Sequence, residues 1–297
     1  MRRHPVLFGI LFLICAGFVF FLVLNGLLKS GGGGYALPAG DKVAIVTLEG
    51  VITNSDRIIR EIEAFAKNDR VKAIVLRIDS PGGSVAPTQE IYDAVLEAGK
   101  KKKIVASMGS IAASGGYLVA CAADRIVANP GTITGSISAV MHFANMEELM
   151  RKIGVSTSVV KSGKYKDIGS PAREMTEEEV SLLQQLVDDV YDQLLETISV
   201  RRKITKENLS LLADGRILTG RQAQKAGLVD FLGNQKYAVR LAGQMTGISG
   251  DPAVVYPPEK KAFILDFLLK SLVRSVKQEL VLDQPKMDGL QYLYCHP

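Results

Sequence analysis

One serine in the chain stands between small residues on both sides, which lets a substrate backbone come close to its hydroxyl. Ser114 follows Ala112 and Ala113 and precedes Gly115 and Gly116. A serine in such a place can act as a nucleophile if a base removes its proton. Because a Ser-Gly-Gly triplet is also a common turn, the interpretation depends on finding the other groups of a mechanism elsewhere in the chain.

The base that such a serine needs is more readily found among lysines than among histidines. His142 is the one histidine of three that is not at a chain end, and the apolar turn before it favours packing over catalysis. Lysine is the base in Ser-Lys enzymes. A lysine that accepts a proton needs a pKa near 7–8 instead of about 10.4, and its surroundings must supply about 4 kcal/mol for that change. Lys161, Lys164 and Lys166 follow a predicted strand at 155–160 and are the candidates.

Backbone N–H groups that could stabilise a negatively charged oxygen follow a second predicted strand. The run VKAIVLRI at 71–78 is apolar and β-branched, and DSPGGS at 79–84 comes directly after it. Gly82-Gly83 offer one N–H group and Gly115 offers another. Each such donor typically stabilises a transition state by about 3 kcal/mol. The same four residues, Ser-Pro-Gly-Gly, would also suit a simple β-turn.

Strand-like and helix-like segments alternate around these residues, which predicts an α/β fold. Parallel βαβ units place the loops at the carboxyl ends of their strands together. Both 79–84 and 108–116 follow such strand ends, so we expect them to meet. The predicted strands are 42–51, 71–78, 104–108, 125–128 and 155–160, and the predicted helices are 56–67, 88–98, 114–123, 177–200 after a Thr176–Glu179 capping box, and 237–245.

The composition bounds the function classes. The chain has 297 residues, 47% of them hydrophobic, and a net charge of +5, but no arginine-rich stripe interleaved with aromatic residues, so we expect no nucleic-acid partner. The three cysteines, Cys15, Cys121 and Cys295, have neither a disulfide framework nor metal-ligand spacing. Neither a P-loop nor a dinucleotide fingerprint is present. We therefore expect no metal and no cofactor.

The N-terminal part predicts a membrane anchor. Residues 1–5 form a basic tip, and 6–28 are apolar and uncharged, long enough at roughly 34 Å to cross a bilayer core of about 30 Å. A cleaved signal peptide is the alternative, but the run is longer than a typical h-region and lacks an Ala-x-Ala site. Because the positive charges precede the span, the N-terminus is expected in the cytoplasm and the catalytic domain outside. Residues 29–41 form a glycine-rich linker.

The C-terminal part is expected to lie outside the main domain. We place the domain at 42–250 and expect the compact part to end at Pro257-Pro258. The extension at 251–297 includes an amphipathic segment at 261–279. Docking on a neighbouring subunit, lying on the membrane surface and packing on its own domain are all open for this segment.

Four segments, in order and spacing, resemble the signal peptide peptidase A (protease IV) family of Ser-Lys peptidases. The likeness covers about residues 42–245, and the predicted anchor also fits. The resemblance implies a fold similar to that of Clp protease and the crotonase enzymes. The segments are DSPGGS (79–84), GSIAASGGYLVACAADRIVANPGTITGSI (109–137), SGKYKDIGSPAREMTEEE (162–179) and ADGRILTGRQAQKAGLVD (213–230).

The resemblance also implies residue roles and an assembly. Ser114 would be the nucleophile and Lys166 the general base, with the Ser136 hydroxyl orienting the lysine. Gly83 and Gly115 would supply the oxyanion N–H groups. The chain is of the short, single-repeat type, which is similar to proteins that form homo-oligomeric rings and share the dyad between neighbouring subunits.

The resemblance, together with the predicted anchor, implies a membrane-anchored serine endopeptidase that degrades remnant signal peptides and other peptides at the membrane through an acyl-enzyme. Small neutral substrate side chains would suit its small-residue surface. One alternative is a crotonase-like acyl-CoA enzyme. Covalent labelling of Ser114 by a peptidyl inhibitor would indicate the peptidase, and binding of CoA esters would indicate the acyl-CoA enzyme. Another is a catalytically idle oligomeric membrane scaffold, which retained cellular function in Ser114→Ala would favour.

Overall fold

The computed structural model describes residues 9, 12–21, 40–258 and 291–293. The chain divides into two compact units, Met1–Ala39 and Gly40–Pro297. In the first unit, residues 12–21 are helical with exposed side chains. No helix among the described residues has both the length and the apolar character needed to cross a membrane. The predicted span at 6–28 extends beyond the described residues on both sides.

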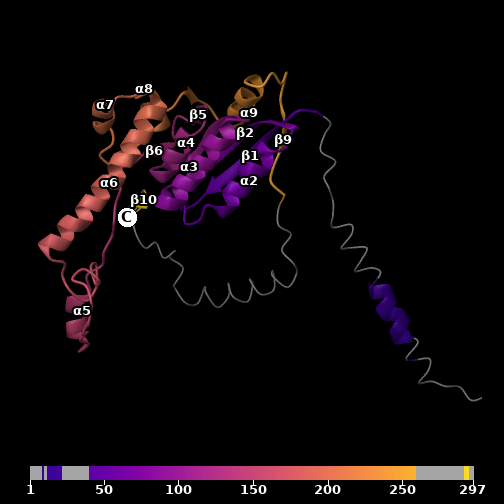
Figure 1. Ribbon diagram of the computed structural model, residues 1–297. Helices are drawn as coiled ribbons and strands as arrows, with labels where there is room; N and C mark the ends of the chain where they lie inside the picture. Colours follow the sequence, from indigo (N-terminus) through magenta and orange to yellow (C-terminus); the bar gives the residue numbers. More distant parts are fainter. Residues whose placement is uncertain (1–8, 10–11, 22–39, 259–290, 294–297) are drawn as a thin grey trace, which may run out of the picture. The chain divides into compact units, whose positions relative to one another are not determined.

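The second unit is built around three long parallel strands (Figure 1). β1 (Lys42–Glu49), β2 (Val71–Ser80) and β4 (Lys103–Ala113) lie side by side in the order β1-β2-β4. Their runs of β-branched and apolar residues are almost completely buried, as expected for strands covered on both faces. The predicted strands are confirmed here, and β4 continues past Met108 to Ala113.

Shorter strands extend this sheet and make it mixed. β4 pairs in parallel with β5 (Arg125–Ala128) along its first part and with β6 (Ile133–Gly135) along its last part. β7 (Ile217–Thr219) is antiparallel to β6. β8 (Phe231–Leu232) pairs with β5, and β9 (Ala253–Val255) pairs with β1 at the edge.

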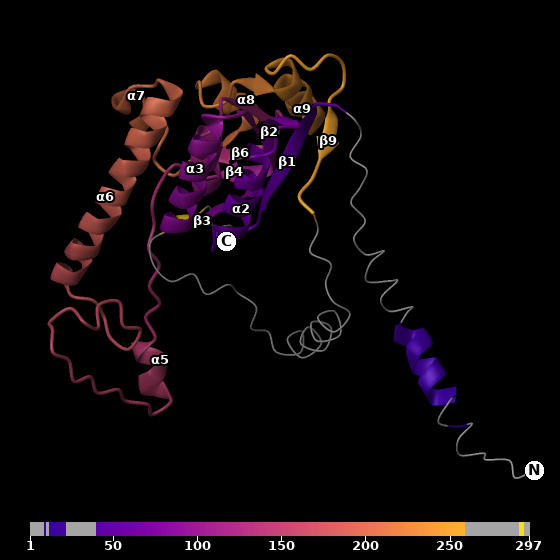
Figure 2. The same cartoon turned by 45° about the vertical axis from the view of Figure 1, so that its right-hand side comes forward.

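Helices cover both faces of the sheet, as Figures 1 and 2 show. α2 (Asp56–Ala66), α3 (Val85–Gly99) and α4 (Gly115–Cys121) contribute to the larger apolar core on one face. α9 (Gln235–Gln244) packs on the other face against residues of β1, β2 and β4. A further short helix, α8 (Gly220–Lys225), follows β7. The helices predicted in these regions are confirmed.

A long excursion separates β6 from β7. It contains α5 (Glu147–Lys152), α6 (Glu177–Arg202) and α7 (Lys206–Ser210). No residue of α5 is buried, and in both views α5 lies beyond the end of α6 that begins at Glu177, away from the sheet (Figures 1 and 2). We call residues 139–176 the arm.

The strand predicted at 155–160 is wrong. These residues of the arm are irregular, and Val160 is 100% exposed. β-Branched residues form strands when a neighbouring strand supplies hydrogen bonds and packing, and no described strand pairs with this segment. Its local pattern is typical of a strand, but the arm provides no sheet for it to join.

α6 begins at the predicted capping box, but only the second half of its apolar stripe is buried among the described residues. The Glu179 N–H donates to Thr176 Oγ1 over 3.2 Å, and the Thr176 N–H donates to Glu179 Oε2 over 2.9 Å. The second half of the helix buries Val190, Leu194, Leu195 and Ile198. The first half leaves three large apolar side chains exposed, those of Val180, Leu182 and Leu186.

A short C-terminal strand returns to the core. β10 (Gln291–Leu293) pairs antiparallel with β3 (Gly82–Ser84), and Tyr292 is part of the larger apolar core. The prediction that the compact part ends at Pro258 is therefore wrong, because a later segment of the chain completes it. The predicted amphipathic segment at 261–279 lies outside the described residues.

Candidate active site

Ser114 occupies the sharp turn between β4 and α4. Its φ of 54° and ψ of −117° lie in a region that residues with a Cβ rarely adopt, and such a conformation costs about 1–3 kcal/mol. Hydrogen bonds on both sides hold it: the Ser114 N–H donates to Gly135 O over 2.8 Å, and the Leu118 N–H donates to Ser114 O over 2.9 Å. Backbone strain that the surroundings enforce in this way is typical of functional sites.

The Ser114 hydroxyl is buried and unpaired. The residue is 1% exposed, and among the described residues Oγ has no hydrogen-bond partner. Leaving a buried hydroxyl unpaired costs about 1–3 kcal/mol, so each such group calls for an explanation. Here the hydroxyl stays available to a base or a carbonyl group that enters the site.

Two pairs of glycines meet beside this serine. Gly82 has a φ of +100°, and its N–H donates to Ser80 Oγ over 3.1 Å. A Cβ on Gly82 would lie 2.7 Å from Gly115 N, and a Cβ on Gly116 would lie 2.7 Å from Ser80 O. Because neither contact leaves room for a side chain, glycine lets the loop after β2 touch the start of α4. The two glycine segments that the sequence singles out therefore converge.

Ser136 lies at the end of the neighbouring strand. β6 pairs with β4 so that Gly135 is opposite Ala113, which places the residues that follow, Ser114 and Ser136, at adjacent strand ends. Ser136 is buried, has a φ of 50°, and donates its N–H to Arg216 O over 2.8 Å. The structure thus gathers both serines at one edge of the sheet.

Lys166 lies in the arm, and the chain does not bring it to Ser114. Its side chain is exposed, and neither Lys166 nor His142 is a partner of the Ser114 hydroxyl. Lys161 and Lys164 form ion pairs with acidic residues, and the hydrogen bond to Glu178 raises the pKa of Lys164. Within the described part of the chain, the Lys166 ammonium has no such partner. Of the three candidate lysines, it is therefore the one that is free to enter another contact.

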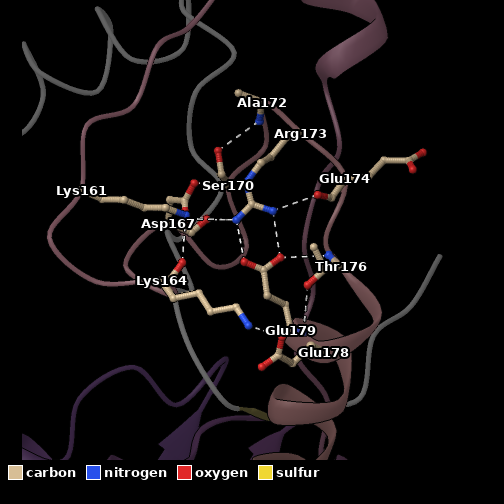
Figure 3. Close-up of polar contacts among 10 residues, drawn as sticks. All are labelled: Lys161, Lys164, Asp167, Ser170, Ala172, Arg173, Glu174, Thr176, Glu178 and Glu179. Carbon is tan, nitrogen blue, oxygen red and sulfur yellow. Dashed lines mark hydrogen bonds and ion pairs between the residues drawn. The ribbon is translucent and has the colours of Figure 1, made fainter.

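Arg173 ties the loop that carries Lys166 to the start of α6 (Figure 3). Its guanidinium donates to the two Glu179 carboxylate oxygens over 2.6 and 2.8 Å and to Asp167 Oδ2 over 3.1 Å. The other Asp167 oxygen pairs with Lys161. The Arg173 hydrogen bonds are the main reason that the pKa of Asp167 is well below its usual range and that the pKa of Glu179 falls from 4.5 to about 2.

This network predicts how the arm responds to acid. Because folding lowers the pKa of Glu179, its contribution to stability is fully present above about pH 4.5 and is lost as the pH falls through about 2. We expect Glu179→Gln to loosen the arm at neutral pH, because the amide cannot form the ion pair with Arg173. Amide hydrogen exchange should rise in 161–175, while exchange in the sheet stays unchanged.

Glu177→Gln is the matched control for that experiment. Glu177 is exposed in the same first turn of α6, so this change should leave exchange in the arm as in the wild type. Wild-type protein should approach the exchange of the Glu179 variant only near pH 2. Equal protection of the arm in both variants would contradict the role of the Arg173 network.

The groups gathered at Ser114 are those that acyl transfer uses. A hydroxyl can attack a carbonyl group, and backbone N–H groups of the converging glycines can stabilise the oxyanion that forms. The missing component is a base, because no described group forms a hydrogen bond with the hydroxyl. In the described residues, no three or more His, Cys, Asp or Glu side chains are grouped to hold a metal ion.

One residue of this region, Tyr292, was not predicted from the sequence. β10 places it opposite Gly83, and its carbonyl oxygen lies close to Gly82. The available signal was the short run QYLY at 291–294, whose aromatic residues favour strands. Such a run is too short to predict a strand, and its partner strand is distant in the sequence.

Comparison with known proteins connects this site to recognised peptidases. The profile of peptidase family S49 matches residues 97–249, which include Ser114, Ser136 and Lys166. The profile of Clp protease matches residues 41–133, which contain β1, β2 and β4. The two matches overlap in the segment that carries Ser114.

Individual relatives agree with these profiles. A Synechocystis sp. protein provisionally named as a protease is 42% identical over 212 residues, which are 71% of this chain and 76% of the relative. The chloroplastic serine protease SPPA of Arabidopsis thaliana is 30% identical over 222 residues, 70% of this chain and 33% of the relative. An Enterococcus faecium protein provisionally named as signal peptide peptidase SppA is 31% identical over 219 residues, 72% and 63% of the two chains. The chain therefore belongs to peptidase family S49, with a Clp protease-like α/β fold, and is a serine peptidase.

Proposed function

We propose that this serine peptidase is a membrane-anchored endopeptidase that uses Ser114 as nucleophile and Lys166 of a neighbouring subunit as general base. One observation carries the proposal: Ser114 sits in a strained strand-to-helix turn with a buried hydroxyl that has no partner in the described chain. A protein retains this combination of strain and an unpaired polar group where function requires it.

In the proposed reaction, Ser114 Oγ attacks the carbonyl carbon of a peptide bond while its proton passes to the neutral amine of Lys166. The N–H groups of Gly83 and Gly115 stabilise the oxyanion, each by about 3 kcal/mol. The tetrahedral intermediate then breaks the C–N bond, and the lysine returns the proton to the leaving amine. Water, deprotonated by the same amine, hydrolyses the ester that remains on Ser114 and regenerates the enzyme.

Ser136 is proposed to orient the amine of the base. Its turn adjoins that of Ser114 through the pairing of β6 with β4, so a lysine that reaches one hydroxyl can also reach the other. A neutral hydroxyl can hold an amine in place without favouring the charged form of the amine. A carboxylate, in contrast, would favour the charged form. Closing the site by assembly would also remove water from the lysine, and burial lowers a lysine pKa.

The exposed surface of the arm supports a base that comes from another subunit. Lys166 lies in the arm, whose helix α5 buries no residue, and many apolar side chains of the arm and of the first half of α6 are exposed. Exposed apolar patches of this kind mark protein interfaces. The exposed apolar residues are Phe143, Met146, Leu149, Ile153, Val155, Val159 and Val160 in the arm, and Val180, Leu182 and Leu186 in α6. We infer a homo-oligomeric ring in which each arm reaches the adjacent sheet.

Mixing two inactive variants tests the shared dyad. Ser114→Ala subunits keep the lysine, and Lys166→Ala subunits keep the serine. In rings reassembled from equal amounts of both, about a quarter of the sites combine an intact serine with an intact lysine from its neighbour. Hydrolysis of a fluorogenic peptide should therefore return to roughly a quarter of the wild-type rate.

The control is each variant reassembled alone, which should remain inactive at the same ring mass in solution. A dyad formed within one subunit predicts no recovery in the mixed rings, because every subunit then lacks one of its two groups. That outcome, with normal assembly, would refute the sharing of the site while leaving Ser114 as the nucleophile.

Anchoring and substrates complete the proposal. Residues 6–28 are proposed to cross the bilayer once, with the N-terminus in the cytoplasm and the catalytic domain on the other side. The apolar side chains of 12–21 are exposed in the structure, which a lipid contact would cover. The Enterococcus relative is named as a signal peptide peptidase, and we propose remnant signal peptides and other peptides at the membrane as substrates.

A further inference from the structure

β4 contains a bulge shortly before the turn that carries Ser114. Its pairing with β2 is regular up to Met108 and resumes at Ala112, but β2 advances by only two residues where β4 advances by four. The single residue Asp79 therefore stands opposite three residues of β4, 109–111, which we call the bulge. Bulges are common beside active sites, where they redirect a strand.

The bulge determines which strand β4 pairs with and where Ser114 lies. Before the bulge, β4 pairs with β5 as far as Met108, and from Ile111 onward it pairs with β6. The two additional residues, at about 3.3 Å each, shorten the reach of β4 by roughly 7 Å. A regular β4 would carry Ser114 that much farther past the end of β2, away from the Gly82 loop and from Ser136.

Two side chains of β2 bind the backbone at both ends of the bulge. The Arg77 guanidinium donates to Met108 O over 3.0 Å, and the Ile111 N–H donates to Asp79 Oδ1 over 3.0 Å. Both side chains are half-buried, and their positions in β2 differ by two residues, so they lie on the same face of the sheet. The bulge is thus fixed by side chains where the regular pairing of β4 with β2 is interrupted.

The Asp79 carboxylate also fits closely against the first residue of the bulge. A Cβ on Gly109 would lie 2.7 Å from Asp79 Oδ2 and 2.8 Å from Asp79 Cγ, so glycine allows the carboxylate to reach the Ile111 N–H. Thr132, which is buried, donates from Oγ1 to Gly109 O over 2.7 Å. The bulge is therefore held from both sides, by β2 and by the residue that precedes β6.

We propose that Asp79 is a positioning residue for the nucleophile, because its carboxylate holds the bulge that places Ser114 beside the Gly82 loop and Ser136. The inference rests on the proposed function of Ser114. Among the described hydrogen bonds, none joins the Asp79 carboxylate to a group that the proposed reaction uses. The carboxylate acts through the backbone of β4 instead.

Kinetics of the full-length protein test this role. Asp79→Ala removes the acceptor of the Ile111 N–H, and kcat for a fluorogenic peptide should fall by about 10²-fold, the factor that a displacement of about 1 Å can cost. KM should change little, since the carboxylate positions the nucleophile and not the substrate. Asp79→Asn keeps an oxygen that can accept this hydrogen bond and should retain most of the wild-type kcat. Asp69→Ala is the matched control, because Asp69 is an exposed acid just before the other end of β2, and it should leave kcat unchanged.

Gly109→Ala disturbs the same contact from the other side, so the test remains decisive if Asp79→Ala does not fold. The added Cβ would displace the carboxylate, and kcat should again fall. In the double variant, the two closest neighbours of this Cβ are absent and a contact of 3.1 Å with the Cβ of residue 79 remains. The two losses in kcat should therefore combine to less than their product.

The reaction of Ser114 with a fluorophosphonate separates positioning from a loss of folded protein. Asp79→Ala and Gly109→Ala should be labelled to the full extent, but about 10²-fold more slowly than the wild type. A wild-type labelling rate in either variant, whether the labelled fraction is full or reduced, would overturn the inference. Hydrolysis that persists in Ser114→Ala would instead overturn the proposed function.

Discussion

Ser114→Ala is expected to lower kcat/KM for peptide hydrolysis by at least about 10³-fold, the scale seen when a serine nucleophile is removed. No other described hydroxyl occupies the turn between β4 and α4, so no second group can form the acyl-enzyme. The measurement is the initial rate on a fluorogenic peptide, combined with mass spectrometry of any trapped acyl-enzyme. The variant should show neither hydrolysis nor a mass increase.

The same change should leave the fold intact. Because Ser114 Oγ has no hydrogen-bond partner in the described chain, its removal breaks no hydrogen bond, and the midpoint of thermal unfolding should not decrease. Ser110→Ala is the matched control, since Ser110 is an exposed serine of the same strand. It should retain wild-type hydrolysis. Full activity in Ser114→Ala would eliminate this serine as the nucleophile.

Lys166→Ala has the second largest expected effect, a loss of about 10²–10⁴-fold in kcat, as is typical when a general base is removed. The loss should appear in kcat with little change in KM, since the lysine acts on the reacting proton. The ring should still form, because the exposed apolar residues of the arm remain. Initial rates and the solution mass together report both properties.

Two lysines in the same loop are built-in controls. Lys161 and Lys164 form ion pairs with Asp167 and Glu178, so their replacement by alanine removes surface contacts but no base. Both variants should keep most of the wild-type kcat. If Lys161→Ala or Lys164→Ala lost as much activity as Lys166→Ala, the loop as a whole would matter and the assignment of Lys166 would fail.

Most of the sheet could be predicted because its strands carry their own pattern. β1 and β2 are β-branched runs that are buried on both faces, and β5 has the predicted bounds Arg125–Ala128. The capping box at Thr176 and Glu179 also follows from local chemistry, since each residue satisfies the backbone of the other. In these places, local preference and tertiary packing agree.

The predictions of secondary structure and packing fail where the structure of a segment depends on contact with another segment far away in the sequence. The segment 155–160 has strand-forming residues but pairs with no described strand, and the first half of α6 has apolar side chains that are exposed in the described structure. β10 is the opposite case, because a short segment becomes a strand only through its pairing with β3. Pairing between segments that are far apart in sequence leaves no periodic signal for local patterns to detect.

The candidate active site, like the fold, could be predicted only in part. Ser114 and the two glycine segments could be brought together by argument, because loops at the ends of parallel strands meet. The position of Lys166 could not, since α5 buries no residue and no described strand pairs with 155–160, so neither segment fixes the loop near the sheet. Its role was inferred from the family resemblance, and the shared-site experiment is its direct test.

The pairing of β10 with β3 also has a consequence for concentration. A ligand carried by the same polypeptide meets its site at an effective concentration that is typically about millimolar. A free peptide at micromolar concentration would then have to bind about 10³ times more tightly than the Tyr292 segment to displace it from half of the sites. The covalent connection would thus favour β10 over a free segment of equal affinity as the partner of β3.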